Sequence, residues 1–356
     1  MCIRDRFYCL EKNKSGGGKN VTKRNEGIDL LKALCMIAVV GLHSQRSIIA
    51  GNVNNAVLYY LARFAMPCFF MINGYLVLNK EEFTFNYYKK KILNMIRVLL
   101  SGGGIAFVYT LIFLGDGVGN AVYNAIKCIL GYYVIPFWWI YTFAIIYTIL
   151  LFSFQKIKNH IRKIMIVLLT ICFAMDLFSF FEIFVRNGYF VQAVVSQRFR
   201  IWTWLMYFCL GYLLGDSEKV KRKKGMCYVA SGVIIMSGVV LLLQCWVCRN
   251  YLGRINSEYL YDNVLLVMWV SLLFLLFTNR SRQLGKVTRR FCNDSFGIFM
   301  LHEFFLEGLG LTEKFTGPFQ SAILLLGLLM VCWCITALTK LILVKWPYPV
   351  SKLLDY

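Results

Sequence analysis

Apolar runs of about 20 residues recur along the whole chain and are separated by short polar stretches. A helix of that length crosses a bilayer core of roughly 30 Å. The pattern predicts an all-α, polytopic membrane helix bundle with about ten spans, near residues 28–50, 56–78, 92–114, 136–154, 163–184, 201–215, 225–247, 259–278, 294–311 and 320–344. The sixth and ninth runs are short, so helices there are expected to be tilted, broken or only partly lipid-facing. An apolar stretch at 120–134 is expected to form an interfacial or re-entrant helix.

Composition supports a membrane protein. Of 356 residues, 59% are hydrophobic and 16% are charged, whereas soluble domains carry about 25% charged residues. No loop between the runs is long enough for a soluble domain. We therefore expect one membrane-embedded domain at 28–345, a flexible cytoplasmic segment at 1–27 without a signal peptide, and a short cytoplasmic tail at 346–356.

The basic residues predict an orientation. If the N-terminus is cytoplasmic, 27 of the 39 Lys and Arg fall in cytoplasmic segments, 8 in outer loops and 4 inside spans. Cytoplasmic loops of membrane proteins are enriched in Lys and Arg, so both termini are expected inside. The net charge of +21 therefore reflects topology. Nucleic-acid binding needs basic residues gathered on one face, and here they lie in short clusters between apolar runs.

No familiar metal or redox motif is present. Most of the 13 cysteines lie in apolar spans, where cysteine behaves as a small hydrophobic residue. Cys245 and Cys248 have redox spacing, but they lie at a helix end without a second pair. No H-E-x-x-H, Walker or EF-hand pattern occurs. We expect no metal site.

Charged residues inside spans are costly, so they are candidates for function. Lys32 and His43 lie eleven residues apart in the first span. This spacing makes nearly three whole helical turns and places both on one face, roughly 16 Å apart along the axis. Lys32 lies near the cytoplasmic end and His43 nearer the outer end. The alternative is that Lys32 extends to the inner surface and His43 is a hydrogen-bonded packing residue.

The second span runs back from the outer side and carries Arg63 at a depth similar to that of His43. A guanidinium beside an imidazole can orient an oxyanion or a carbonyl group. Contact with lipid phosphate is the alternative. Pro67 is expected to kink this helix, and Asn73-Gly74 to allow close approach of another backbone or a ligand.

Two further spans carry candidates. Trp138, Trp139 and Tyr141 fit an interfacial aromatic belt, and they can equally line a cavity mouth and stack on a sugar. His302 lies mid-membrane, next to Glu303 and one turn before Glu307. Neighbouring residues do not share a helix face, so Glu303 is not expected to orient His302. Asp176 in the fifth span is a weaker candidate.

The order of these motifs resembles the acyltransferase-3 family of membrane-bound acyltransferases, many of which modify bacterial cell-surface polysaccharides. Lys32-x10-His43 is similar to the family's basic-x10-His pattern, and Arg63 with Pro67 to its Arg-x3-Pro motif. The similarity covers nearly all of residues 24–345 and includes three further stretches, Phe137–Tyr141, Trp204–Tyr212 and Ser295–His302. The chain departs from the family at Asn73, where serine is common before Gly-Tyr.

The resemblance implies an O-acyltransferase that takes an acyl group, often acetyl, from cytoplasmic acyl-CoA and passes it to a hydroxyl at the outer face. It implies Lys32 and His302 as residues that bind acyl-CoA, His43 as general base and Arg63 as the group that stabilises charge on the thioester oxygen. Imidazole has a reference pKa of about 6.5, which suits a base near neutral pH. Asn73, Trp138, Trp139 and Tyr141 are expected to bind substrate.

Other readings of the sequence remain open. A transporter or flippase for a small polar solute or lipid-linked sugar would use the intramembrane charges as a relay, although no inverted repeat is evident. A sensor or assembly protein without chemistry is a third reading. The acceptor can be a polysaccharide, a peptidoglycan precursor, a glycolipid or a free small molecule, and the sequence fixes neither the acyl group nor the oligomeric state.

Overall fold

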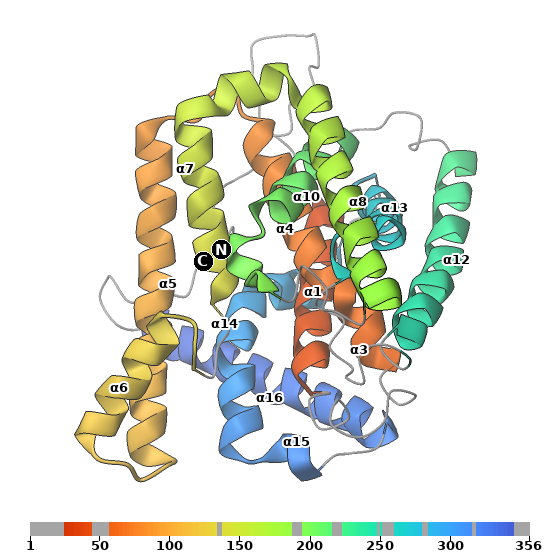
Figure 1. Ribbon diagram of the computed structural model, residues 1–356. Coiled ribbons are helices and arrows are strands. Elements are labelled where there is room, and N and C mark those ends of the chain that lie inside the picture. Colours follow the sequence, from red (N-terminus) through yellow and green to blue (C-terminus); the bar gives the residue numbers. More distant parts are fainter. Residues whose placement is uncertain are drawn as a thin grey trace.

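Helices make up the regular structure of every part of the chain that the computed structural model describes, namely residues 25–44, 57–133, 137–186, 194–215, 223–247, 250, 260–279, 284–314 and 318–344 (Figure 1). These ranges contain no strand, so the predicted all-α class is confirmed for them. The termini lie outside the described residues, and so do Arg46, Arg249 and Arg254 of the predicted outer loops. The elements are α1 (Glu26–Ser44), α3 (Val57–Leu61), η2 (Ala62–Phe64), α4 (Ala65–Leu78), α5 (Phe85–Ile112), α6 (Val118–Ile129), α7 (Trp138–Asn159), α8 (Ile161–Arg186), η3 (Gln197–Phe199), α10 (Ile201–Leu214), α12 (Lys223–Val247), α13 (Val264–Thr278), α14 (Lys286–Gly308), α15 (Leu311–Lys314) and α16 (Pro318–Val344).

Seven helical segments among the described residues are long and apolar enough to cross a membrane. Two further apolar helices, α10 and α13, are shorter than a full span. Helix α14 has sufficient length at 23 residues, but its first half carries several charged side chains. Each of the ten predicted apolar runs therefore coincides with a helix, while the number of complete crossings stays a prediction.

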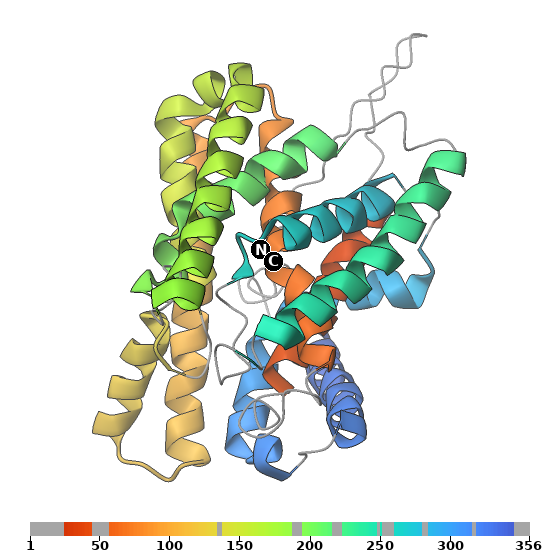
Figure 2. The same cartoon turned by 45° about the vertical axis from the view of Figure 1, so that its right-hand side comes forward.

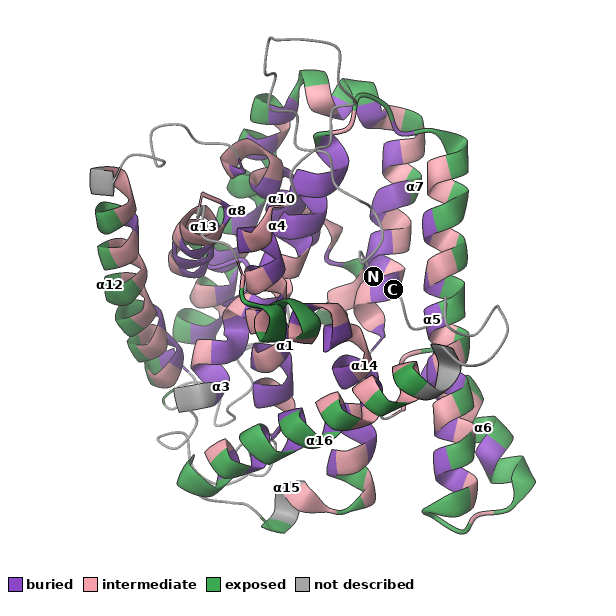
Figure 3. Cartoon of the chain, turned by 180° about the vertical axis from the view of Figure 1, so that it is seen from behind, coloured by how far each residue is buried: buried purple, intermediate pink, exposed green. Residues whose placement is uncertain are grey.

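The helices divide into an inner and an outer group (Figure 3). The apolar window of α1 is 67% buried within the protein, and that of the segment from Tyr59 to Leu78 is 78% buried. The corresponding windows of α8 and α12 are only 28% and 11% buried, although they are among the most apolar. An apolar surface this extensive is stable in lipid and not in water. The chain is a multi-pass membrane protein.

The centre of the bundle is the crossing of α4 and α10, where two glycines allow the backbones to touch. A Cβ at Gly74 would collide with the backbone carbonyl of Phe208, and one at Gly211 with that of Met71. Small residues are the usual means by which membrane helices approach closely. The close approach expected at Asn73-Gly74 is therefore made by a neighbouring backbone.

Helices α5 and α6 form a hairpin at the edge of the bundle (Figure 2). Helix α5 has 28 residues, about 42 Å at 1.5 Å per residue, which exceeds the thickness of a bilayer core. Helix α6 returns along its far end, with Ile129 against Gly103. At 12 residues, α6 is the short helix expected at 120–134 and cannot cross a membrane.

Candidate active site

The start of α1 is fixed by hydrogen bonds that also attach it to α13. The side chain of Asn25 accepts hydrogen bonds from the backbone N–H groups of Gly27 at 3.0 Å and Ile28 at 3.3 Å. Its amide donates to the Thr278 carbonyl at the end of α13, at 3.1 Å. Side-chain capping of this kind satisfies the N–H groups that a helix leaves unpaired at its start. These hydrogen bonds hold the start of α1 in one orientation about its axis. They therefore also determine where the face with Lys32 and His43 points.

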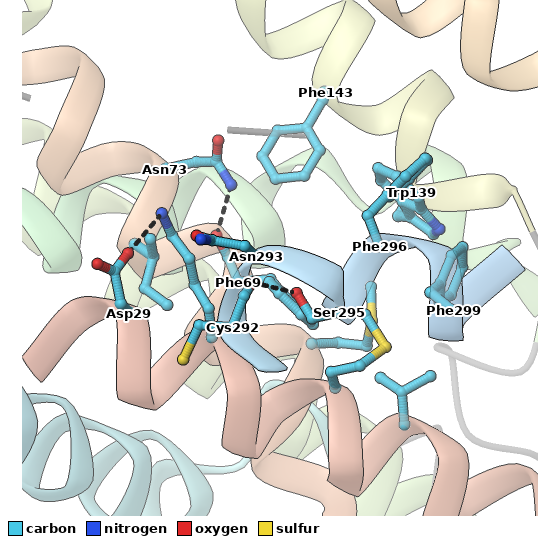
Figure 4. Close-up of a pocket in the computed structure, with 15 residues that line it drawn as sticks. Asp29, Phe69, Asn73, Trp139, Phe143, Cys292, Asn293, Ser295, Phe296 and Phe299 are labelled. Atoms are coloured by element: carbon cyan, nitrogen blue, oxygen red, sulfur yellow. Dashed lines mark hydrogen bonds and ion pairs between the residues drawn. The ribbon is translucent and has the colours of Figure 1, made fainter. Parts of the chain in front are cut away.

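A pocket lies along that face of α1, between α1, α4, α7 and α14 (Figure 4). It is partly open at its surface, and its cavity volume is about 100 Å³. One end is polar and the other is aromatic. The polar end carries Asp29, Lys32, Asn73 and Asn293, and the aromatic end carries Trp139, Phe143, Phe296 and Phe299.

Lys32 belongs to the polar end of this pocket. Its ammonium lies 3.9 Å from the carboxylate of Asp29, and its side chain is 18% exposed. Met36 and Val39 continue the pocket lining along α1, at the helical spacing that Lys32 begins. His43 is the next residue on this face, one turn beyond Val39. The predicted shared face of Lys32 and His43 is thus the face that lines the pocket.

Beyond the aromatic end, His43 makes a direct contact with Glu303 of α14, at hydrogen-bonding distance. The contact joins His43 Nδ1 to a carboxylate oxygen of Glu303. The Glu303 side chain is fully buried, whereas that of His43 is 16% exposed. A carboxylate that accepts a hydrogen bond from Nδ1 leaves Nε2 of the neutral ring as a proton acceptor. This is the arrangement of a general base held by a carboxylate.

His302 completes the cluster from the neighbouring position of α14. Its ring lies 5.2 Å from that of His43, centroid to centroid, in an edge-to-face arrangement. Its Nδ1 lies 2.7 Å from the carbonyl oxygen of Phe299, so Nδ1 carries the proton, and buried Nε2 has no hydrogen-bond partner among the described residues. Glu303 pairs across the helix interface with His43, which agrees with the expectation that it does not orient its neighbour His302.

His43, His302 and Glu303 are also the described residues best placed to approach a metal ion. Their ligand atoms lie within 4.8 Å of one another. The direct contact between His43 Nδ1 and Glu303 already engages two of the three groups with each other. A metal ion would have to separate this pair, so the geometry favours a hydrogen-bonded dyad.

Arg63 lies in η2, directly before α4. Pro67 has no N–H to bond to the Arg63 carbonyl, and the chain forms a 3-10 turn over Ala62–Phe64, so the kink expected at Pro67 appears as this turn. Arg63 is 1% exposed, and its guanidinium lies 3.9 Å from the centroid of the Tyr261 ring. Its neighbour Ala62 faces Gly41 of α1. Arg63 is therefore buried in protein near the C-terminal part of α1, which does not fit contact with lipid phosphate.

The predicted substrate-binding residues separate into two groups. Asn73 and Trp139 line the pocket, and the Asn73 side chain also accepts a hydrogen bond from Tyr147 at 3.2 Å. Trp138 packs on Trp204 with ring centroids 5.0 Å apart. Tyr141 donates a hydrogen bond to the carbonyl of Ile129 at the end of α6. Trp138 and Tyr141 are not part of the pocket lining.

Two other intramembrane charges lie away from the pocket lining. Asp176 of α8 is 4% exposed and is not a lining residue. Lys340 of α16 pairs with Asp294 of α14 at 2.9 Å, and Asp294 also accepts a hydrogen bond from Trp333 at 2.9 Å. This second cluster ties α14 to α16, and Lys340 also donates a hydrogen bond to the carbonyl of the lining residue Asn293 at 3.2 Å.

Sequence reasoning did not anticipate the partner of His43. Glu303 was visible as a carboxylate in an apolar run, and its cost in a membrane marked it as unusual. Its partner lies in a helix far away along the chain, and only the packing of α1 against α14 shows which residue it meets.

Comparison with known protein families gives one match. The sequence profile of an acyltransferase domain, Acyl_transf_3, matches residues 25–339 and so covers most of the chain. This range contains every helix of the site and all of the lining residues of the pocket. No curated protein and no solved structure matches the chain.

Proposed function

We propose that this chain, which belongs to the acyltransferase-3 family, is an O-acyltransferase of a bacterial cell envelope. In this proposal it moves an acyl group, taken to be acetyl, from cytoplasmic acyl-CoA to a hydroxyl of a cell-surface polysaccharide or related glycan. The family match favours this activity over the transporter and sensor readings. The observation that carries the proposal is the pocket that begins at Lys32 and leads along α1 toward the His43–Glu303 pair.

The direction of transfer follows from the proposed topology of ten spans with both termini in the cytoplasm. Lys32 then lies at the inner end of the pocket, where it can pair with the phosphates of CoA. The pantetheine arm extends past Met36 and Asn73 toward the aromatic end. The thioester arrives near His43, which lies toward the outer side. In this proposal the pocket leads from the compartment that holds the donor toward His43, and the acceptor reaches His43 from the outer side.

His43 acts as general base in the proposed reaction. Its Nδ1–H is held by Glu303, and its Nε2 takes the proton of the acceptor hydroxyl as the hydroxyl oxygen attacks the thioester carbonyl carbon. A new C–O bond forms, and the carbonyl oxygen becomes negatively charged. When this tetrahedral intermediate collapses, the C–S bond breaks and the proton on His43 passes to the CoA thiolate. The products are the acylated glycan and free CoA, and the enzyme returns to its starting state.

The other site residues have supporting roles in this proposal. Arg63 supplies positive charge to the developing oxyanion, in a site from which water is largely excluded. His302 packs against the end of the donor pocket through Phe299. Asn73 and Trp139 contact the donor along the pocket, while Trp138 and Tyr141 are proposed to contact the acceptor near its outer rim.

The proposal is tested by acyl transfer in proteoliposomes that contain the full chain. Radiolabelled acetyl-CoA is supplied with a panel of defined glycan acceptors, and label in alkali-labile ester is measured. We expect transfer by the wild type and a loss of about a hundredfold or more in His43→Ala, since a general base contributes roughly 10²–10⁴-fold. His160→Ala is the matched control, because His160 is an exposed histidine at the other end of the bundle. Equal turnover in His43→Ala and the wild type would remove the base from the mechanism.

A further inference from the structure

The pocket lining ends in the same way on three helices. On α1 the lining residue Val39 is followed one turn later by His43, and on α14 the lining residue Phe299 is followed by His302 and Glu303. On α4, which runs in the opposite direction, Met66 is the last lining residue, and Arg63 lies one turn beyond it. Three apolar side chains, Val39, Met66 and Phe299, therefore separate the open pocket from the polar cluster. We call these three residues the apolar layer.

Phe299 is the largest member of the apolar layer and packs against two other aromatic rings. It is 6% exposed. Its ring packs edge-to-face on Trp139 at 5.7 Å and against the His302 ring at 5.7 Å. Its backbone carbonyl accepts the hydrogen bond from His302. Figure 4 shows Phe299 with Trp139 and Phe296 at the end of the pocket opposite Asp29.

We propose that the apolar layer is the seat of the acyl group and restricts the donor to short acyl chains, with Phe299 as the main determinant. This inference rests on the proposed function, since it assumes that acyl-CoA enters from the polar end. The thioester carbonyl must lie within reach of a hydroxyl that His43 activates. The acyl carbon chain that extends from this carbonyl is then surrounded by Val39, Met66 and Phe299.

Close packing supplies the selectivity. Side chains in a protein interior pack at nearly crystalline density, so added methylenes fit only where a side chain gives up volume. Phe299 is held on one side by Trp139 and on the other by His302, and it cannot move away easily. A longer acyl chain would have to displace this ring or hold the thioester short of His43.

The chain offers a matched pair of variants. Phe296 and Phe299 are the same residue type, lie on the same helix and line the same pocket. They are separated by one turn, with Phe296 nearer the polar end. Removing the Phe299 ring enlarges the pocket at the apolar layer, whereas removing the Phe296 ring enlarges it before that layer. Val39 and Met36 form a second such pair on α1.

The test measures donor binding, so that it does not depend on knowing the acceptor. Full-length protein in lipid nanodiscs binds radiolabelled acetyl-CoA, and unlabelled acetyl-, butyryl- and hexanoyl-CoA compete. We expect the wild type to bind hexanoyl-CoA more weakly than acetyl-CoA. We expect Phe299→Ala to shift the hexanoyl-to-acetyl affinity ratio toward hexanoyl-CoA by about tenfold or more, since one methylene in an apolar pocket is worth roughly tenfold or more in discrimination. Phe296→Ala is expected to shift this ratio less, because Phe296 packs on Phe299 with ring centroids 6.4 Å apart but lies nearer the polar end of the pocket.

The outcomes separate the two proposals. If the wild type binds no acyl-CoA, the donor assigned under the proposed function is wrong, and the acyl seat is wrong with it. If acetyl-CoA binds but the wild type does not discriminate against hexanoyl-CoA, the acyl seat alone is overturned. An equal shift in Phe296→Ala and Phe299→Ala also overturns it. If Phe299→Ala does not fold, the second pair of variants is used. Val39→Ala is expected to shift the hexanoyl-to-acetyl affinity ratio toward hexanoyl-CoA, and Met36→Ala is expected to leave it unchanged. Equal ratios in these two variants contradict the proposal.

Discussion

Glu303 and His43 are far apart in the sequence and meet directly in the structure, where a carboxylate oxygen of Glu303 lies at hydrogen-bonding distance from His43 Nδ1. Glu303 is fully buried between the helices, and His43 retains an exposed edge. The carboxylate therefore fixes the ring, and in the proposed reaction the other ring nitrogen faces the substrate. A lone histidine in a membrane helix is more often a packing residue than a catalytic one. The contact between His43 and Glu303 favours the catalytic role.

Glu303→Gln is expected to lower kcat by about a hundredfold, since an amide can hold the imidazole in the wrong tautomer and cannot stabilise the imidazolium. The KM for acetyl-CoA is expected to change little, because Glu303 does not line the pocket. Steady-state kinetics of acyl transfer in proteoliposomes provides both values. The control is Glu307→Gln, an exposed glutamate one turn further along α14. A loss of similar size in both variants would mean that α14 as a whole, and not the pair, is sensitive.

Lys32→Ala is expected to weaken acetyl-CoA binding by about tenfold, which corresponds to the loss of one hydrogen bond from a charged group worth roughly 1.5 kcal/mol. The effect should diminish at high salt, because screening weakens the attraction between Lys32 and the CoA phosphates. Competition binding in nanodiscs measures it, and Lys90→Ala, an exposed lysine near the start of α5, is the control. The KM for the acceptor should not change in Lys32→Ala, and equal effects on donor and acceptor would contradict a donor-binding role.

Gly74→Ala is expected to destabilise the bundle by about 1–3 kcal/mol, the usual cost of overpacking a well-packed core. The added Cβ would collide with the Phe208 carbonyl, which is backbone and cannot rotate away. Thermal unfolding in detergent measures the change. Gly104→Ala on α5 is the control, because nothing lies within 4 Å of a Cβ there. An unaltered unfolding temperature for Gly74→Ala would show that α4 and α10 are not held together at this crossing.

The proposed topology predicts a cytoplasmic C-terminus. A green fluorescent protein fused after Tyr356 should be fluorescent, and an alkaline phosphatase fused at the same residue should be inactive, because the first folds in the cytoplasm and the second requires export. Fusions after Tyr132, which lies in the proposed outer segment between α6 and α7, should give the opposite result. An active phosphatase at Tyr356 would place the tail on the outer side and contradict the proposed topology, either through an odd number of crossings or through the reverse orientation of the whole bundle.

The sequence by itself determined the class of the protein and much of the site. The length and apolarity of the runs required helices in a membrane, because a backbone in lipid must satisfy its own hydrogen bonds. Helical periodicity placed Lys32 and His43 on one face, since both lie on the same helix and their relation is local. The order of the motifs indicated the family that residues 25–339 match.

Tertiary structure decided which residues meet across helices. The carboxylate beside His43 comes from Glu303, and the ring beneath the Arg63 guanidinium comes from Tyr261. Trp139 lines the pocket, whereas the neighbouring Trp138 packs against Trp204. Such contacts depend on the crossing of helices and on glycine positions such as Gly74. Periodicity gives the direction of a side chain about its own helix, and only the packing of that helix gives the partner.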